Sequence, residues 1–445
     1  MRLAAALALL LAPAPALAGP YDAVEHIIVI SLENHSFDNL FGDFPGAEGR
    51  AQAKAKNVIQ RDRAGKAYAT LPQVMDTRQE PAVADSRFPA DLANAPFPIE
   101  RYVPAEEKTG DLVHKFYHQQ DQIHGGRMDR FAAVSDAGGL VMGYYDGSRL
   151  GLWNYAKRYT LLDHFFAGAF GGSMLNHFWL VCACAPRFAN APQELVARFD
   201  KAGEMVHGGS VTPDGYAVNT VFSQQQPHPR ALDGSDKLMP PQRMPTIADR
   251  LEEKGISWAW YAGGWNDADD GNADKSFQFH HQPFVYFAGF GEGEKRREHL
   301  KDEEDFLDAL QDGNLPAVSF YKPLGKFNLH PEYTDITSGD AHITRILKAI
   351  EASPLWPRTV VIVTFDENGG YWDHVAPPAG DRFGPGMRVP TLVISPFSRK
   401  GYVDHGVYET SSILAFIEKR HGLKPLNHRD AKAADIGRSL LIAPD

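Results

Sequence analysis

Two pairs of polar residues each follow an apolar, β-branched run of the sequence. The pairs are Glu33-Asn34 and Asp366-Glu367. Residues directly after a strand are no longer held on opposite faces, so each pair can point into one cleft. Three carboxylates crowded together repel one another unless a cation lies between them, and an all-oxygen site suits a hard divalent ion. The alternative is that these residues cap the helices that follow, as Asp and Asn often do.

A hydroxyl nucleophile is offered by the segment Gly171-Gly172-Ser173, which precedes an apolar run typical of a helix. Glycines let the backbone approach a ligand closely. Ser173 would lie in the first helical turn, where the dipole and the free N–H groups stabilise an alkoxide and a bound phosphate. A metal ion that touches the hydroxyl would lower its pKa further. The commoner use of such a serine is as a plain N-cap.

Four of the 18 histidines lie in sequence contexts that make them candidates for a functional role. They are His114, His280, His281 and His330. Imidazoles can bind phosphate oxygens or protonate a leaving group, and both roles would favour an acidic working pH. The alternative for each is a structural histidine whose ring nitrogens are satisfied within the fold.

Apolar runs that do not alternate with polar residues predict strands that are covered on both faces. The runs are 26–32, 258–261, 317–320, 359–365 and 391–394. Helix-period stretches occur at 246–254, 303–310, 343–350 and 411–420. The alternation predicts an α/β fold with a mostly parallel sheet and helices on both faces. Ligands of such sheets bind beyond the carboxyl ends of the strands, where both polar pairs lie.

The length allows two or three domains, or one large α/β domain with insertions, and the composition is that of a globular protein with long loops. The chain has 445 residues, 43% hydrophobic and 23% charged, which excludes wholesale disorder. We expect a single α/β domain over 19–445, with insertions around 44–107, 186–245 and 263–293. Lys and Arg number 45 against 56 Asp and Glu, and the net charge of −11 argues against a nucleic-acid partner.

Residues 1–18 have the pattern of a secretory signal peptide. Arg2 precedes an Ala/Leu run, and Ala16-Leu17-Ala18 forms a small-x-small cleavage site, so we expect cleavage near Ala18. The run is shorter than the roughly 20 residues that span a bilayer. We therefore expect a periplasmic or secreted protein without a stable membrane anchor, and we leave its oligomeric state open.

The two cysteines, Cys182 and Cys184, lie in a run that is expected to be helical. Positions i and i+2 of a helix do not face each other, so we do not expect a bond between them. The two thiols are instead expected to be small buried side chains.

Taken in order, these segments resemble a bacterial phosphoesterase family that includes exported acid phosphatases and phosphatidylcholine-type phospholipases C. The landmarks begin with Glu33-Asn34-His35-Ser36-Phe37-Asp38 and end with Asp366-Glu367-Asn368-Gly369-Gly370. Between them lie 111–114, 126–131, 142–145, the Gly-Gly-Ser segment, 281–284 and 330–331. The resemblance implies an alkaline-phosphatase-like α/β fold and hydrolysis of phosphate esters through a phospho-enzyme.

The same resemblance implies roles for particular residues. The metal ligands fall on Glu33, Asn34, Asp366 and Glu367, and the nucleophile, which also touches the metal, falls on Ser173. The phosphate-contacting histidines fall on His114, on His281 with His280 beside it, and on His330.

The segment around the nucleophile departs from the phospholipase pattern. Those members carry Gly-Pro-Thr-x-x-Asn-Arg, whereas this chain has Gly172, Ser173 and His177 in the places of Pro, Thr and Arg. This version resembles the acid phosphatase branch.

The sequence therefore predicts an exported, metal-dependent acid phosphatase that hydrolyses small phosphomonoesters through a phosphoserine. One divalent ion is expected, and Ca, Mg, Mn and Zn all remain open because each accepts carboxylates. A first alternative is a phospholipase C-type phosphodiesterase, which the aromatic stretch 277–290 keeps open. That stretch lies in 263–293, where crowded aromatic residues form either local core or a substrate-facing lid. A second alternative is an exported protein that binds metal or phosphate without turnover.

Overall fold

The computed structural model describes residues 21–442, and its centre is an eight-stranded sheet. In spatial order the strands are β10 (Leu300–Lys301), β9 (Trp258–Ala262), β11 (Val318–Lys322), β1 (His26–Leu32), β12 (Thr359–Phe365), β13 (Arg388–Ile394), β6 (Thr160–Phe166) and β14 (Tyr402–Glu409). Neighbouring strands pair in parallel except at β13, which is antiparallel to both β12 and β6. The predicted α/β class with a mostly parallel sheet is confirmed.

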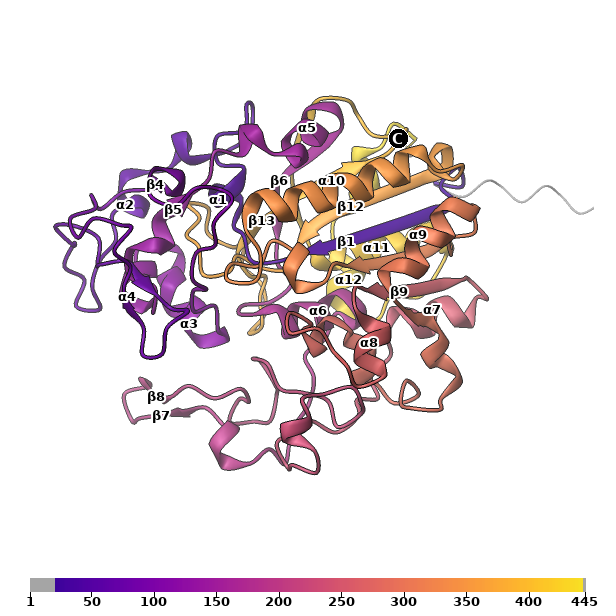
Figure 1. Cartoon of the computed structure of the whole chain (residues 1–445), viewed down its shortest axis with the longest axis horizontal. Helices are drawn as coiled ribbons and strands as arrows, with labels where there is room; N and C mark the ends of the chain where they lie inside the picture. Colours follow the sequence, from indigo (N-terminus) through magenta and orange to yellow (C-terminus); the bar gives the residue numbers. More distant parts are fainter. Residues whose placement is uncertain (1–20, 443–445) are drawn as a thin grey trace, which may run out of the picture.

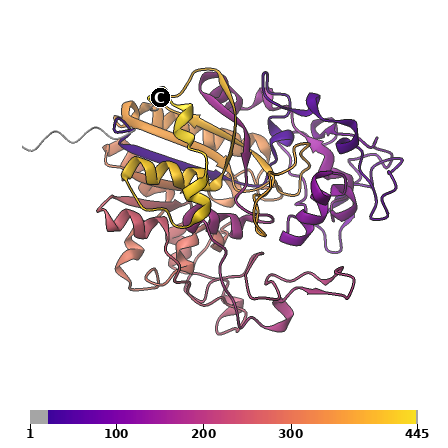
Figure 2. The same ribbon diagram turned by 180° about the vertical axis from the view of Figure 1, so that it is seen from behind.

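Helices cover both faces of this sheet because its central strands have no polar face to leave in water. All seven residues of β12 are buried, as are six of the seven in β1. The helices α9 (Glu303–Asp312) and α10 (Ile336–Ala352) lie on the face turned forward in Figure 1. On the opposite face, seen in Figure 2, α11 (Thr410–His421) packs against α6 (Ser173–Cys182). Consecutive apolar residues were the signal for this two-sided burial.

The remaining helices and strands are short. They are α1 (Phe37–Leu40), α2 (Ala55–Val58), α3 (Phe116–Ile123), α4 (Phe131–Val134), α5 (Gly151–Arg158), α7 (Ile247–Glu253), α8 (Trp265–Asp269), α12 (His428–Lys432), β2 (Met75–Asp76), β3 (Val83–Ala84), β4 (Phe97–Pro98), β5 (Gly143–Tyr144), β7 (Arg198–Phe199) and β8 (Met205–His207). Several of them, including α2, α3, α4 and β4, gather beyond the carboxyl ends of β1 and β12, on the left in Figure 1. The chain therefore places loop-rich structure over the edge of the sheet where the polar pairs lie. The domain boundaries and insertion limits predicted above stay predictions.

The thiols of Cys182 and Cys184 form a disulfide, so the expectation of two unbonded cysteines was wrong. The argument assumed that the helix continues through both residues. Instead α6 ends at Cys182, and Ala183 takes the left-handed conformation with φ 46°. Cys184 consequently lies outside the helix, where the i, i+2 geometry of a helix no longer applies.

The predicted signal peptide, with its cleavage site near Ala18, lies outside the described residues. Within 21–442, no helix is long and apolar enough to cross a membrane.

Candidate active site

The site is centred on a contact between the start of α6 and the end of β1. Ser173 is the first residue of α6, and its Oγ donates a hydrogen bond to Oε2 of Glu33 over 2.9 Å. Glu33 follows β1 directly and is fully buried. The N-cap of α6 is Gly172, so Ser173 does not serve as the plain cap that was the alternative.

The acidic residues after β12 meet those after β1 because the two strands are parallel neighbours in register from end to end. The backbone N–H of Asn34 donates to Oδ1 of Asp366 over 3.2 Å. The side-chain amide of Asn34 reaches to within 2.8 Å of Oε1 of Glu367 and 3.1 Å of Oε2 of Glu33, where its nitrogen donates to both carboxylates in one orientation and its oxygen faces them in the reversed orientation. Glu33, Asn34, Asp366 and Glu367 thus form one group, which we call the acid cluster.

Close packing and hydrogen bonds fix the positions of two loops beside the acid cluster, the loop after β12 and the loop before α6. Gly369 has φ 58°, and a Cβ there would lie 2.3 Å from the carbonyl oxygen of Asn34, so only glycine fits. Gln119 of α3 donates to Oδ1 of Asn368 over 2.7 Å and accepts from the N–H of Gly171 over 3.1 Å. One side chain therefore joins the loop after β12 to the loop that carries the nucleophile.

Burial makes the charge of the acid cluster costly. Burial and the neighbouring charge of Glu33 raise the pKa of Asp366 to about 7. Burial likewise raises the pKa of Glu367 well above its ordinary value. Burial opposes the ionisation of Glu33 too, but the charges of Lys322 and His281 outweigh it and hold this pKa low. Lys322 thus offsets the negative charge of Glu33 and Asp366, whereas the positive group beside Glu367 is His114.

The donor set of the acid cluster fits a divalent cation. Its side chains offer carboxylate and amide oxygens, and Oδ2 of Asp366 is buried without a hydrogen-bond partner. A buried carboxylate oxygen without a partner is costly unless a cation or a proton satisfies it. Hard divalent ions prefer such oxygen ligands.

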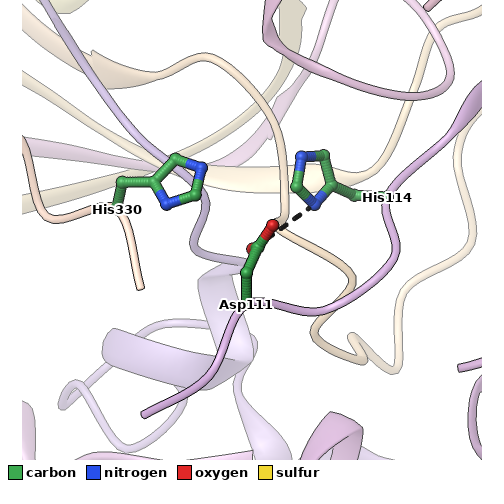
Figure 3. Close-up of side chains that lie close together, drawn as sticks. All are labelled: Asp111, His114 and His330. Carbon is green, nitrogen blue, oxygen red and sulfur yellow. Dashed lines mark ion pairs between the residues drawn. The ribbon is translucent and has the colours of Figure 1, made fainter. Parts of the chain in front are cut away.

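Two of the predicted histidines lie together beside the acid cluster. The rings of His114 and His330 are 6.1 Å apart, and Figure 3 shows them with Asp111 lying between. Nε2 of His114 lies 3.8 Å from Oε1 of Glu367, and its Nδ1 lies 3.7 Å from Oδ1 of Asp111. Burial lowers the pKa of His114, but the charges of Glu367 and Asp111 prevail and raise it to about 9.

The neighbouring histidines His280 and His281 differ in what they contact. Nε2 of His281 lies 3.2 Å from Oε1 of Glu33, whereas Nδ1 of His280 is buried without a partner. The two rings are 4.7 Å apart in an edge-to-face arrangement. His281 is therefore the member of the pair that joins the acid cluster, and burial lowers its pKa to about 4.

Two residues of this centre were not assigned to it by the sequence analysis. Lys322, the last residue of β11, is fully buried, and its Nζ pairs with Oε1 of Glu33. His177 lies one helical turn after Ser173, and a ring nitrogen, an oxygen of Glu33 and an oxygen of Asp366 lie within 4.8 Å of one another. For Lys322 the available signal was its position at the end of a strand that neighbours β1. For His177 it was the i, i+4 spacing from Ser173 on the same helix.

Comparisons with known proteins match most of the chain to one family. The model described as the phosphoesterase family matches residues 24–424. A non-hemolytic phospholipase C of Pseudomonas aeruginosa is 24% identical over 91% of this chain and 55% of its own length. Phospholipase C B of Mycobacterium tuberculosis is 25% identical over 93% of this chain and 77% of its own length. The chain therefore spans about half of the first relative and about three quarters of the second.

Solved structures that are similar to the chain include a protein of the alkaline phosphatase superfamily from Vibrio parahaemolyticus, at 13% identity and a TM-score of 0.36, which covers 66% of this chain and 65% of its own. A phosphonate monoester hydrolase of Agrobacterium radiobacter shares 11% identity at a TM-score of 0.40, over 95% of this chain and 78% of its own. The family match, which spans the acid cluster, Ser173 and the histidines, shows that the chain belongs to the phosphoesterase family.

Proposed function

We propose that the chain hydrolyses phosphate esters through a phosphoserine formed at Ser173. The observation that supports this most is the 2.9 Å hydrogen bond from Oγ of Ser173 to Glu33, within a buried acid cluster. A serine at the start of a helix has free N–H groups beside it, which stabilise negative charge on an attacking oxygen and on phosphate.

In this proposal Glu33, Asn34, Asp366 and Glu367 hold one divalent cation. The buried, unpartnered oxygen of Asp366 supports a ligand in their midst. When bound, such an ion supplies positive charge that lowers the pKa of a nearby hydroxyl and offsets the charge of a phosphoryl group. The all-oxygen donor set favours Ca, Mg or Mn, and Zn also accepts carboxylates.

The side chains divide the reaction between them. Oγ of Ser173 attacks phosphorus in line, and its proton passes to the carboxylates around it while the bond from phosphorus to the leaving oxygen breaks. His114 lies beside Glu367, His330 beside Asn34 and His281 beside Glu33, which supports the proposal that these imidazoles contact a phosphoryl group at Ser173. One of these imidazoles protonates the departing oxygen, and water then cleaves the phosphoserine.

We propose phosphomonoesters as the substrate class, on two grounds. Gly172, Ser173 and His177 depart from the phospholipase pattern around the nucleophile. In addition, the aromatic stretch that could have formed a lipid-facing lid is largely core: Phe277, Phe284 and Phe290 are buried, and Phe284 packs against Trp258 with ring centroids 4.8 Å apart. Buried rings are unavailable to a lipid.

A phospholipase C-type phosphodiesterase is the second candidate. It is favoured by the names of the relatives, because two of the curated proteins that match most of this chain are phospholipases C. Both candidates use the same nucleophile and acid cluster, so the mechanism above does not separate them.

Paired chromogenic substrates test the choice. The kcat/KM of the metal-loaded protein is measured on p-nitrophenyl phosphate and on p-nitrophenyl phosphorylcholine, with the Ser173→Ala variant as the control for contaminating activity. The proposal predicts faster hydrolysis of the monoester. Preference for the phosphorylcholine ester would replace it by the second candidate, and no hydrolysis of either would leave a binding protein.

A further inference from the structure

A second group of metal-binding side chains lies at the edge of the sheet and outside the acid cluster. Asp163 and His164 belong to β6, and His405 belongs to the edge strand β14. One ligand atom from each residue lies within 4.8 Å of the other two. We call these three residues the His–Asp cluster.

A buried carboxylate holds the two imidazoles of the His–Asp cluster. Asp163 is fully buried. Its Oδ1 lies 2.9 Å from Nδ1 of His164, and its Oδ2 lies 2.8 Å from Nδ1 of His405. The backbone N–H of Glu48 donates to the same Oδ2 over 2.8 Å. The groups that hydrogen-bond to this carboxylate are thus two imidazoles and one backbone amide, and Nη1 of the buried Arg388 donates to the backbone carbonyl of the same residue over 3.1 Å.

The second ring nitrogen of His164, Nε2, lies beside a carboxylate, as the second nitrogen of a metal-bound histidine often does. Its Nε2 lies 3.1 Å from Oε2 of Glu48. Metal-bound histidines almost always donate their second ring N–H to a carboxylate, a carbonyl or water, which fixes the tautomer and leaves the other nitrogen free to bind. Glu48 can therefore accept from the Nε2–H of His164, and a metal ion that bound Nδ1 would take the place of the hydrogen that Nδ1 donates to Asp163.

A β-bulge brings His405 to this position. Between Asp404 and Val407, β14 advances three residues while its neighbour β6 advances two, from Leu162 to His164. The extra residue lets a side chain of the edge strand turn toward Asp163, as bulges commonly do. The side chain of His405 is 60% exposed and that of Glu48 is 45% exposed, so the His–Asp cluster is open to solvent.

We propose that Asp163, His164 and His405 bind a divalent transition-metal ion of the Zn²⁺ class at a site separate from the acid cluster. Imidazole and carboxylate together suit Zn, Cu, Co and Ni, whereas Ca and Mg prefer oxygen alone. Around an ion with bonds of about 2.0–2.1 Å, tetrahedral ligand atoms are about 3.3 Å apart, so separations of 2.8 and 2.9 Å need only a small opening to admit one. Solvent would complete the coordination at the exposed side.

Metal counting with matched variants tests this proposal. The full chain, stripped with a chelator, is titrated with Zn²⁺ by calorimetry and with Co²⁺ by its visible absorption. The variants are His405→Ala and His164→Ala, and the control is His428→Ala, another solvent-facing histidine in the helix α12. Circular dichroism establishes that each variant is folded.

We expect His405→Ala to bind one equivalent of Zn²⁺ fewer than His428→Ala. If the equivalent at the His–Asp cluster is still bound, its dissociation constant should be at least about tenfold higher than in the control. When the stripped proteins are titrated with Co²⁺, the visible absorption typical of tetrahedral Co²⁺ should be weaker for His405→Ala than for the control. Because the comparison is a difference between two variants, it does not depend on whether the acid cluster is loaded or whether the protein hydrolyses phosphate esters. Equal Zn²⁺ binding by His405→Ala and His428→Ala would overturn the proposal.

Discussion

The hydroxyl of Ser173 and the carboxylate of Glu33 are joined by a hydrogen bond although 140 positions separate them in the chain. Each residue lies at the terminus of a regular element. Ser173 is the first residue of α6, and Glu33 directly follows Leu32, the last residue of β1. The contact brings a hydroxyl to a group of buried acids, and the following predictions test what that arrangement does.

Exchange of Ser173 for Ala should remove the nucleophile while leaving the acid cluster intact. We expect kcat on p-nitrophenyl phosphate to fall by at least about a thousandfold, as loss of a covalent nucleophile does elsewhere. Metal content, measured by elemental analysis, should stay near that of the parent protein. Ser173→Thr, which keeps a hydroxyl, is the matched control and should retain measurable turnover. Activity that survives in Ser173→Ala would show that another group attacks phosphorus.

Exchange of Asp366 for Asn should weaken metal binding, because it removes the negative charge of a carboxylate whose Oδ2 is buried without a hydrogen-bond partner. The loss of affinity should exceed the roughly 10–100-fold that removal of a mere supporting partner costs. Asp340→Asn is the control, because Asp340 is also buried but binds the N–H groups of Gly151 and Leu152. If both variants keep the metal equally well, Asp366 is not a ligand.

Exchange of Lys322 for Met should destabilise the protein by leaving Glu33 without its buried partner. Both side chains of this ion pair are fully buried. Removing one partner of a buried pair typically costs about 3–5 kcal/mol, because the other charge stays uncompensated. Denaturant unfolding measures the free-energy difference. Lys326→Met, at a neighbouring lysine whose side chain is 48% exposed, should change stability by far less. Similar effects of the two substitutions would argue against a special role for the buried pair.

Exchange of Glu418 for Gln should stabilise the protein at neutral and alkaline pH. Burial and the adjacent Asp430 raise the pKa of Glu418 to about 9. The unfolded chain ionises this group near pH 4.5, whereas the folded protein keeps it protonated, so the contribution of Glu418 is full below pH 4.5 and is lost as the pH rises toward 9. Glutamine imitates the protonated form at every pH.

Thermal unfolding across the pH range checks this sign. The Tm advantage of Glu418→Gln over the parent should be near zero at pH 4 and should grow up to pH 9. Glu298→Gln, at an exposed glutamate, provides the baseline. An advantage that is constant with pH would mean that Glu418 ionises in the folded protein as it does in the unfolded chain.

The parts of the fold that the sequence predicted best are those with an unbroken apolar signal. The runs 26–32 and 359–365 coincide with β1 and β12. The strand β6 was missed because Asp163 and His164 interrupt its apolar run, and β14 was missed because only two of its eight residues are buried. Both strands lie toward one edge of the sheet, where sequence patterns carry less information than at its centre.

The acid cluster could be anticipated because parallel strands end at one edge of a sheet, so that polar residues after β1 and β12 must meet. The same rule applied to β11 would have drawn attention to Lys322, but a lysine at a strand end is ordinary in a sequence. The Cys182–Cys184 bond could not be anticipated, because the pattern does not reveal that α6 ends between the two cysteines. The left-handed conformation of Ala183, which ends the helix at Cys182, is what allows the bond.

Trapping of the covalent intermediate tests the central claim most directly. The metal-loaded protein is mixed with p-nitrophenyl phosphate, quenched in acid within the first turnover, digested and analysed by mass spectrometry. The account predicts a phosphoryl group on Ser173 in the parent protein and none on that peptide in the Asp366→Asn variant. Phosphate attached to a different residue, or rapid turnover with no phosphorylated peptide, would contradict it.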